Sequence, residues 1–345
     1  MSHLSLPLKF RPRTLAEVVG QPHVTTGLVN AINNDRIRQA YLFSGIRGTG
    51  KTTLARVLAA ALNCLEAEGP TPKPCLKCRS CEAVHVGDDV SVFEIDGASN
   101  NKVDDIRSLK DDVGTYAMHG RFKIYIIDEC QMLTKQAFNA LLKTLEEPPS
   151  HVKFILCTTE LAKVPKTIQD RCQLFRFNPI ADEVLSDQLG WVLEHEGVEY
   201  DGEFTMELAK MAQGSLRSGL TLLDQLINTG GRLTAATLEG FFGKPMRSRV
   251  QGLLTAISRG DIVNTIRSLK HLTSRGFSEY FVVTTVIDAL QELMTKRLDE
   301  PDKLEVIIDI ILDLEALSRV VRSSETPKAL LEASLLKTTL KRREK

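Results

Sequence analysis

The feature that most constrains this chain is a phosphate-loop motif at residues 45–52, which matches the pattern G-x-x-x-x-G-K-[ST]. The motif consists of Gly45, Ile46, Arg47, Gly48, Thr49, Gly50, Lys51 and Thr52. An apolar run at residues 41–43 precedes it, and an Ala-rich helical stretch at residues 54–62 follows it. Phosphate loops require this strand, loop and helix order. The sequence therefore predicts a nucleotide-binding site on an α/β fold.

Each residue type in this loop has a physical reason to be there. The glycines let the backbone turn its N–H groups onto phosphate oxygens, and the following helix offers the positive end of its dipole. Lys51 adds a point charge, and Thr52 is placed to hold magnesium. We include Thr53 in the predicted nucleotide-binding set. The alternative, a glycine-rich turn that binds nothing, is disfavoured because Lys-Thr stands directly before an uninterrupted helix.

A second motif complements the phosphate loop. The apolar run at residues 122–127 ends in the paired carboxylates Asp128 and Glu129. A buried parallel strand delivers its last residues to the edge of the sheet where ligands of open α/β folds bind. We therefore expect Asp128 to hold magnesium and Glu129 to polarise the attacking water. The alternative is a solvated acidic turn with no chemical role.

The order of apolar segments predicts the fold class. Strand candidates alternate with helical stretches and lie at residues 41–43, 90–95, 123–127, 154–158 and 174–177. This alternation indicates a five-stranded parallel sheet with helices on both faces. We expect an α/β core at residues 1–178, three helices at 179–243 and an all-α domain at 244–345. The helices expected in the last domain lie at 249–258, 261–274, 278–298, 302–322 and 327–343.

Four of the seven cysteines lie close together in a Pro-rich insertion at residues 64–81. They are Cys64, Cys75, Cys78 and Cys81. This spacing suits a tetrahedral, structural Zn²⁺ site with no open position for substrate. Unrelated buried thiols are one alternative. An iron–sulfur cluster is the other, but the fourth cysteine followed by proline that is typical of ferredoxin runs is missing.

Composition restricts the possible partners and location. Lys plus Arg and Asp plus Glu both number 44, so the formal net charge of the 345-residue chain is zero. Strong sequence-independent attraction to nucleic acid or to anionic membranes is not expected of the isolated chain. We find no apolar run long enough to span a membrane and no signal peptide at the N-terminus. These features predict a cytosolic, cytoplasmic protein without a membrane partner.

Taken together, the motifs resemble those of the bacterial DNA polymerase III gamma/tau family, the clamp-loader ATPases of the AAA+ class. The resemblance covers almost the whole chain and rests on residues 10–12, 18–21, 40–45, 94–99, 128–129 and 138–149 and on the four cysteines. It implies that residues 1–178 are the AAA+ core, 179–243 the lid and 244–345 a collar that holds subunits together. It also implies ATP, Mg²⁺ and Zn²⁺ as ligands.

The resemblance implies roles for further residues. Arg11, Pro12 and Val19, in an N-terminal arm at residues 9–21, match the segment that packs on adenine. Thr159 matches the residue that senses the γ-phosphate, and Arg217 matches the second sensor on the lid. The implied catalytic set is Lys51, Asp128, Glu129, Thr159, Arg171 and Arg217. Within it, Arg171 matches the arginine finger, which acts on the ATP of a neighbouring subunit.

Two departures from the family pattern bear on these roles. Asp170 stands before Arg171 where the family has serine, so a carboxylate is expected to tether or neutralise the finger. Ser218 follows Arg217 where the family tends to have aspartate, and this is expected to loosen the lid. The chain also stops soon after the expected collar helices, as in a gamma-length product or a shortened piece of the longer tau form.

The function implied is that of an ATPase which, with delta and delta-prime subunits and further copies of itself, opens a sliding clamp and loads it onto primer–template DNA. Polymerase activity would belong only to the holoenzyme. One alternative is a non-hydrolysing structural subunit like delta-prime. The other is an AAA+ ATPase that remodels a different DNA-bound ring, such as a helicase loader or branch-migration motor.

Overall fold

The computed structural model describes residues 4–101, 112–117, 119–243, 247–274, 277–295, 297–321 and 323–343. The chain divides into two compact units, residues 1–231 and residues 232–345. All the strands of the described residues lie in the first unit, and the second is helical. The first unit therefore contains the sheet, and with it the loop at residues 45–52.

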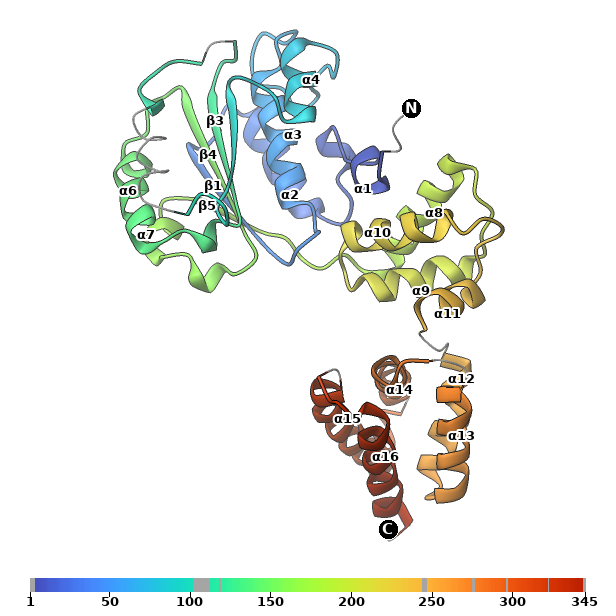
Figure 1. Ribbon diagram of the computed structural model, residues 1–345. Helices are drawn as coiled ribbons and strands as arrows, with labels where there is room; N and C mark the ends of the chain where they lie inside the picture. The colour runs from blue at the N-terminus through green and yellow to red at the C-terminus, as the bar shows by residue number, and fades with distance from the viewer. Residues whose placement is uncertain are drawn as a thin grey trace. The chain divides into compact units, whose positions relative to one another are not determined.

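A parallel sheet with strand order β2-β3-β4-β1-β5 forms the centre of the first unit (Figure 1). The strands are β1 (Ala40–Ser44), β2 (Val92–Asp96), β3 (Lys123–Asp128), β4 (Val152–Thr158) and β5 (Gln173–Arg176). Every residue of β1 and β4 is buried, as expected of strands covered on both faces. The predicted five-stranded parallel sheet is confirmed.

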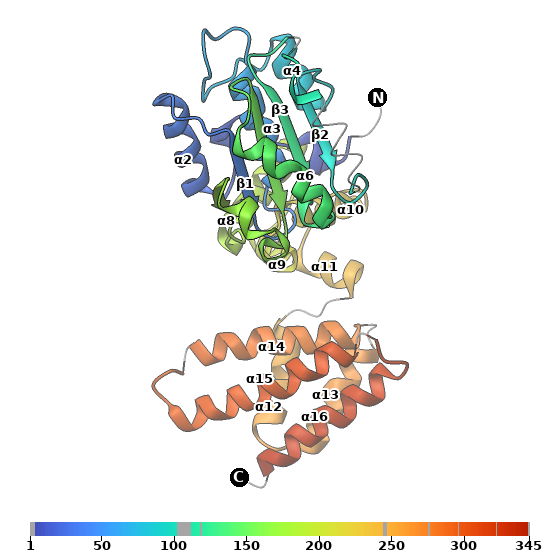
Figure 2. The same ribbon diagram turned by 90° about the vertical axis from the view of Figure 1, so that its left-hand side faces the viewer.

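Helices cover both faces of this sheet (Figures 1 and 2). The α-helices of the first unit are α1 (Leu6–Lys9), α2 (Pro22–Asn33), α3 (Lys51–Asn63), α4 (Arg79–Val86), α6 (Lys135–Glu146), α7 (Lys166–Gln169), α8 (Asp182–Glu196), α9 (Gly202–Ala212) and α10 (Leu216–Ile227). Short 3-10 turns lie at Leu15–Glu17, Cys130–Met132 and Leu161–Lys163. Helices α2 and α3 share one hydrophobic core with the sheet, and α6 and α7 share another.

This topology brings the predicted motifs to one edge. Because all five strands are parallel, their carboxyl ends meet at the same edge of the sheet. The loop after β1 is the phosphate loop, β3 ends at Asp128, and Thr159 follows β4. In register, Ser44 of β1 pairs with Thr158, and Asp96 of β2 pairs with Asp128. The sheet edge thus gathers groups that lie far apart in the sequence.

The N-terminal arm is fixed at the junction between the sheet and helices α8–α10. Gln21 is fully buried. Its side chain donates to the carbonyl of Asn178 at 2.8 Å and accepts from the amide of the same residue at 3.1 Å. This bidentate contact satisfies backbone groups of a segment that belongs to neither a helix nor a strand.

The second unit consists of α11 (Ala235–Phe242), α12 (Arg247–Ser258), α13 (Ile262–Ser274), α14 (Glu279–Thr295), α15 (Pro301–Val321) and α16 (Pro327–Arg343). The five helices predicted after residue 248 correspond to α12–α16, and their apolar faces form one hydrophobic core. Residues 179–243 contain three helices in the first unit and α11 in the second. The predicted start of the last domain, residue 244, lies outside the described residues.

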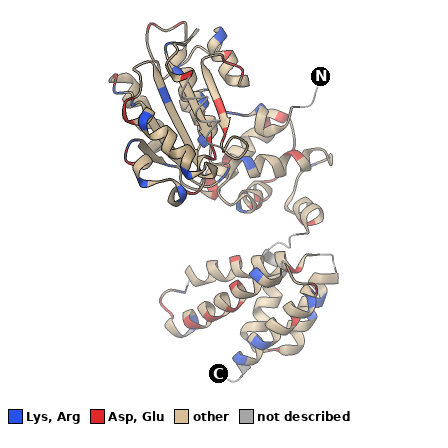
Figure 3. Ribbon diagram, turned by 60° about the vertical axis from the view of Figure 1, so that its left-hand side comes forward, with Lys and Arg blue, Asp and Glu red and all other residues tan. Residues whose placement is uncertain are grey.

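Charges of both signs are interspersed over the elements of both units (Figure 3), in keeping with the formal net charge of zero. Among the helices that the structure describes, none is both long and apolar enough to cross a membrane.

Candidate nucleotide-binding site

A cleft of about 550 Å³ lies at the carboxyl edge of the sheet. Its walls come from the N-terminal arm, the phosphate loop, the ends of β2 and β3, and helix α10. The predicted site residues that line it are Arg11, Pro12, Val19, Arg47, Gly48, Thr49, Gly50, Lys51, Thr52, Thr53, Asp128, Glu129 and Arg217. The tertiary structure therefore places most of the predicted residues around one cavity.

The backbone of the phosphate loop has the conformation that its glycines permit. Gly48 and Gly50 have φ of +83° and +101°, in the left-handed region that other residues avoid. Thr49 donates its hydroxyl to the carbonyl of Ile46 at 2.9 Å, which closes the turn. Helix α3 begins at Lys51, so its free N–H groups and positive dipole end face the cleft.

Lys51 is buried and folds back onto its own loop. Its ammonium donates to the carbonyls of Gly45 and Ile46, at 2.7 and 2.8 Å. Burial lowers the pKa of Lys51, while the carboxylates of Glu129 and Asp128 act in the opposite direction. Gly45 and Ile46 thus contribute through their carbonyls rather than as lining of the cleft.

The two predicted magnesium ligands lie in direct contact. Thr52 donates its hydroxyl to Oδ2 of Asp128 at 2.7 Å. Asp96, which sequence reasoning missed, ends the neighbouring strand and also lines the cleft. Its position at the end of a strand next to the one that carries Asp128 was the available signal. Oxygen donors from a hydroxyl and carboxylates form the hard ligand set that suits Mg²⁺.

Glu129 belongs to a hydrogen-bond network at the end of β3. Its φ of +45° is uncommon for a residue other than glycine, and such backbone strain concentrates at functional sites. Oε2 of Glu129 accepts from Nε2 of Gln131 at 2.7 Å and from the hydroxyl of Thr159 at 3.0 Å. The structure therefore places the predicted sensor Thr159 against Glu129, and it adds Gln131, which the sequence did not single out.

Helix α8 contacts the start of the arm, and the arm itself lines the cleft. The ring of Phe10 meets that of Trp191 edge-on, with centroids 5.6 Å apart, and Lys9 pairs with Glu196 at 2.7 Å. Arg11 lines the cleft itself. Burial lowers the pKa of Arg11, and the positive charge of Arg56 adds to that effect.

Helix α10 packs directly on the phosphate loop. The amide of Arg217 donates to the carbonyl of Gly48 at 3.4 Å. A Cβ placed on Gly48 would lie 2.1 Å from Oγ of Ser215. Only glycine at position 48 allows this approach, so the loop and the helix that carries Arg217 fit together without space for a side chain.

The contacts of Ser218 lie at the start of α10, and the expectation that this residue loosens the lid stays a prediction. Ser215 is the N-cap residue of α10, and its Oγ accepts from the amide of Ser218 at 3.2 Å. The two hydroxyls also lie 2.8 Å apart. Ser218 therefore helps to fix the start of the helix, as capping residues do.

Arg171 lies away from the cleft, and its carboxylate partner differs from the expected one. Its guanidinium pairs with Glu146 at the end of α6 and donates to the carbonyl of Thr167 at 2.7 Å. Asp170 instead pairs with Lys166 at 3.0 Å. The expectation that Asp170 tethers Arg171 is wrong, because the Asp170 side chain turns back along α7.

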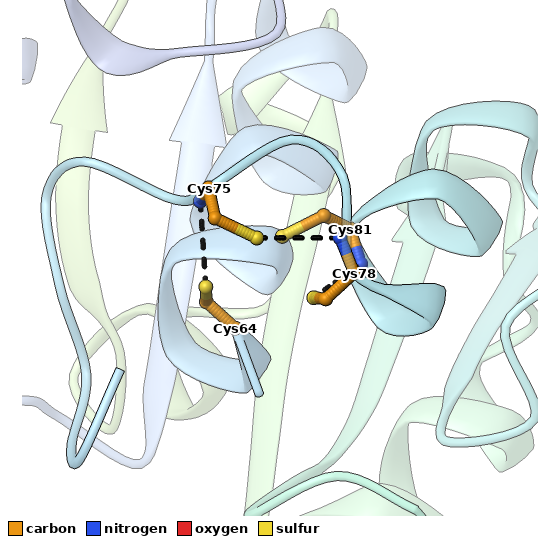
Figure 4. Close-up of side chains that lie close together, drawn as sticks. All are labelled: Cys64, Cys75, Cys78 and Cys81. Atoms are coloured by element: carbon orange, nitrogen blue, oxygen red, sulfur yellow. Dashed lines mark hydrogen bonds between the residues drawn. The ribbon is translucent and has the colours of Figure 1, made fainter. Parts of the chain in front are cut away.

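The four predicted zinc ligands converge in space (Figure 4). The sulfur atoms of Cys64, Cys75, Cys78 and Cys81 all lie within 4.8 Å of one another. Cys64 caps the end of α3, and Cys78 caps the start of α4. A tetrahedral zinc with Zn–S bonds of about 2.3 Å requires sulfurs somewhat less than 4 Å apart, so the cluster needs only a small contraction to fit the ion.

Backbone amides already direct hydrogen bonds at these sulfurs. The amide of Cys75 donates to Sγ of Cys64 at 3.4 Å, and that of Cys78 donates to Sγ of Cys75 at 3.3 Å. Burial opposes ionisation of Cys78, but amide donors from Cys81 and Leu65 prevail and lower its pKa to about 7, whereas burial and the hydrogen bond with Cys78 raise the pKa of Cys81. Zinc binds the thiolate form, so metal binding at this cluster would release the proton that Cys81 holds.

Two protein-family profiles match the first unit of the chain. A family profile described as "DNA polymerase III, delta subunit" matches residues 20–181. A second, described as "DNA polymerase III clamp loader subunit, ATPase lid domain", matches residues 184–232. The two matches follow each other along the first unit.

Several curated proteins are similar over most of the chain. DNA polymerase III subunit gamma of Buchnera aphidicola subsp. Baizongia pistaciae is 36% identical over 85% of this chain and 79% of its own length. Subunit tau/gamma of Haemophilus influenzae is 42% identical over 79% of this chain, and subunit tau of Escherichia coli is 40% identical over 86%. The chain spans only 39% and 46% of the length of these last two relatives.

Solved structures share the fold at lower identity. The RuvB Holliday junction branch migration motor of Thermotoga maritima is 17% identical, with a TM-score of 0.50 over 72% of this chain and 79% of that chain. At this level of identity the similarity extends to the fold alone.

Proposed function

Because this chain belongs to the gamma/tau family of DNA polymerase III subunits, we propose that it is an ATP-hydrolysing subunit of a bacterial clamp loader. In this role, ATP binding assembles a complex that opens the sliding clamp and places it on primer–template DNA, and hydrolysis releases the clamp. A cytoplasmic location follows from that role. Any polymerase activity belongs to the holoenzyme that the subunit serves.

The observation that carries this proposal is the cleft at the sheet edge. It joins a phosphate loop to a hydroxyl–carboxylate pair, Thr52 and Asp128, and to a held carboxylate, Glu129. The arm that supplies Arg11 and Pro12 provides a surface for adenine. Helix α10 brings Arg217 to the same cavity, where the positive charge would meet the phosphates.

Hydrolysis requires an in-line attack on the γ-phosphorus. The oxygen of water forms the new P–O bond while the bond to the bridging oxygen breaks, and ADP leaves with that bond's electrons. Glu129 takes one proton from the water. The ammonium of Lys51 gives up its hydrogen bonds to the loop carbonyls and donates to phosphate oxygens instead. The hydroxyl of Thr159 likewise gives up its hydrogen bond to Glu129 and donates to the γ-phosphate.

Thr52 and Asp128 would hold Mg²⁺ at the floor of the cleft, where their oxygens already meet. When bound, the ion offsets the negative charge of the β- and γ-phosphates. Asp96, at the end of the neighbouring strand, is available for a bound water.

Arg171 fits a different role, because it points away from the cleft of its own chain. We assign it to the ATP of a neighbouring subunit, which makes the complete site a composite of two chains. Its partners in such an assembly would be further copies of this chain and the delta and delta-prime subunits. Helices α12–α16 form a second unit with its own core and are the proposed collar.

The proposal is tested by measuring ATP hydrolysis with and without delta and delta-prime, a sliding clamp and primed DNA. We expect stimulation by clamp and primed DNA together. A chain that binds ATP but never hydrolyses it would instead be a structural subunit like delta-prime. Hydrolysis that ignores clamp and primed DNA would point to remodelling of another ring.

Replacing Gly48 by alanine should weaken ATP binding by about tenfold or more. The new Cβ would collide with Ser215 and strain a backbone at φ +83°, a conformation that costs L-residues about 1–2 kcal/mol. The collision would push α10 and Arg217 off the phosphate loop. Isothermal calorimetry with a slowly hydrolysed ATP analogue measures the loss.

Gly50→Ala is the matched control, because Gly50 also has positive φ but no atom lies within 4 Å of its added Cβ. The difference between the two variants isolates the contact with α10. Equal losses in both would show that this contact does not contribute to nucleotide binding.

The cysteine cluster is the proposed zinc site of the chain. The four sulfurs come from three segments: Cys64 from the end of α3, Cys75 from the loop after it, and Cys78 and Cys81 from the start of α4. A bound Zn²⁺ would tie this insertion to the helix that follows the phosphate loop. With four thiolate ligands it has a structural role.

Purified protein should contain one zinc per chain, and Cys75→Ser should lose it with a lower melting temperature. Cys172→Ser is the matched control, since Cys172 is a half-buried thiol outside the cluster. Metal analysis and thermal unfolding measure both effects. Stoichiometric iron with a brown colour would contradict the assignment and indicate an iron–sulfur cluster.

A further inference from the structure

The end of β3 carries a side chain to which the proposed mechanism assigns no role. Gln131 lies in the 3-10 turn Cys130–Met132 directly after Asp128 and Glu129, and it is half-buried. It touches both the proposed base and the proposed γ-phosphate sensor. Gln131 therefore links two residues that the proposed mechanism uses.

The amide of Gln131 uses both of its ends. Nε2 donates to Oε2 of Glu129 at 2.7 Å and to the hydroxyl of Thr159 at 2.9 Å. Oε1 accepts from the hydroxyl of Thr158 at 2.7 Å. Because the carboxylate of Glu129 can only accept, it must face Nε2 of Gln131, and this leaves Oε1 to accept from the hydroxyl of Thr158.

Thr158 is itself fully buried at the end of β4. Its oxygen accepts from the amide of Glu160 at 3.0 Å, which leaves its proton directed at Gln131. Glu129 and Thr158 therefore hold the two ends of the Gln131 amide.

We propose that Gln131 is a positioning residue that couples Glu129 to Thr159. This inference rests on the proposed ATPase function and deepens it. The hydroxyl of Thr159 donates to Oε2 of Glu129 at 3.0 Å, so it cannot at the same time donate its proton to a γ-phosphate. When Thr159 turns to the phosphate, Glu129 loses one of two donors, and Gln131 alone keeps its carboxylate aimed at the water.

The arrangement makes turnover, and not ATP binding, depend on Gln131. No atom of Gln131 lines the cleft, whereas Glu129 does. Removing the amide therefore leaves the nucleotide contacts in place and frees the carboxylate to rotate. Losing a hydrogen bond to a charged group costs more free energy than losing a neutral one, so we expect kcat to fall about tenfold to a hundredfold.

The test uses Gln131→Met, which keeps the length of the side chain and removes its donors and acceptor. Single-turnover hydrolysis and calorimetric ATP affinity are measured on the full chain, alone and assembled with delta and delta-prime. We expect kcat to fall by that factor while ATP affinity changes less than about twofold. In a Glu129→Gln background the same substitution should have no further effect, because the two residues act as one unit.

Gln169→Met is the matched control. Gln169 is also half-buried and donates two hydrogen bonds, but to the backbone carbonyls of Leu161 and Val164. Its loss should lower thermal stability without a selective fall in kcat. Thr158→Val is a second variant, of nearly the same shape, that leaves Gln131 in place and removes the hydroxyl contacts to Gln131 and to the Glu160 amide, and we expect a smaller fall in kcat.

The outcomes separate this inference from the proposed function. Turnover within twofold of wild type in Gln131→Met, or a loss of the same size in the Glu129→Gln background, would overturn the coupling while leaving the ATPase intact. If Gln131→Met fails to fold, unchanged turnover in Thr158→Val overturns it instead. A wild-type chain without hydrolysis would contradict the proposed function itself.

Discussion

Glu129→Gln should abolish turnover while leaving ATP binding unchanged. A general base contributes about 10²–10⁴-fold to a rate, and the amide cannot accept the proton of the attacking water. The substitution preserves side-chain size and an acceptor oxygen, so the contacts from Gln131 and Thr159 persist. We therefore expect kcat to fall by about two to four orders of magnitude, as measured by phosphate release, with the ATP dissociation constant changed less than about twofold.

Glu160→Gln is the control for this prediction. Glu160 is an exposed carboxylate just beyond the same edge of the sheet, it pairs with Lys163 at 2.8 Å, and it does not line the cleft. Its neutralisation should leave kcat unchanged. Persistent turnover in Glu129→Gln would require another base, and Asp96 would be the first candidate to test.

Arg171→Ala should impair hydrolysis only in the assembled complex. The guanidinium lies outside the cleft of its own chain, on an exposed edge beside Glu146. An arginine supplied to a neighbouring phosphoryl-transfer site is worth about 10³–10⁵ in kcat. We expect a loss approaching that range for the complex with delta and delta-prime, and no change in the slow hydrolysis by the isolated chain.

Two matched variants sharpen this experiment. Arg176→Ala removes the same charge from the exposed end of β5 and should leave the complex active. Glu146→Gln removes the carboxylate that Arg171 pairs with, so it should leave assembled hydrolysis equal to wild type or higher. A loss in the isolated chain of the same size as in the complex would contradict a role across the interface.

Much of the fold could be read from the sequence because its signals are local. The strands are short, largely apolar runs, and three of them are mostly buried, so all five could be predicted to within about two residues of their observed limits. The four-cysteine cluster could also be predicted, because three of its members follow one another at C-x-x-C spacing and the fourth ends the preceding helix. The phosphate loop at residues 45–52 could be identified from its motif together with the predicted strand before it and the predicted helix after it.

Side-chain partners were harder to predict because they depend on which strands become neighbours. The sequence suggested that Asp170 would contact Arg171, since the two are adjacent. Adjacent residues on a short helix point in different directions, and Asp170 reaches back one turn to Lys166. Glu146, 25 residues earlier, is brought to Arg171 by the packing of α6 on α7.

The sequence by itself determined the chemical groups available at this site: which loop has the pattern of a phosphate-binding loop, which carboxylates follow a strand and which thiols are spaced to share a metal. These are properties of residue type and short spacing, and a chain carries them before it folds. Only the tertiary structure decided that Thr159 contacts Glu129, that Thr158 contacts Gln131 and that Ser215 packs against Gly48, because each of these contacts joins different elements at the sheet edge. Their geometry exists only once β3, β4 and α10 are packed together.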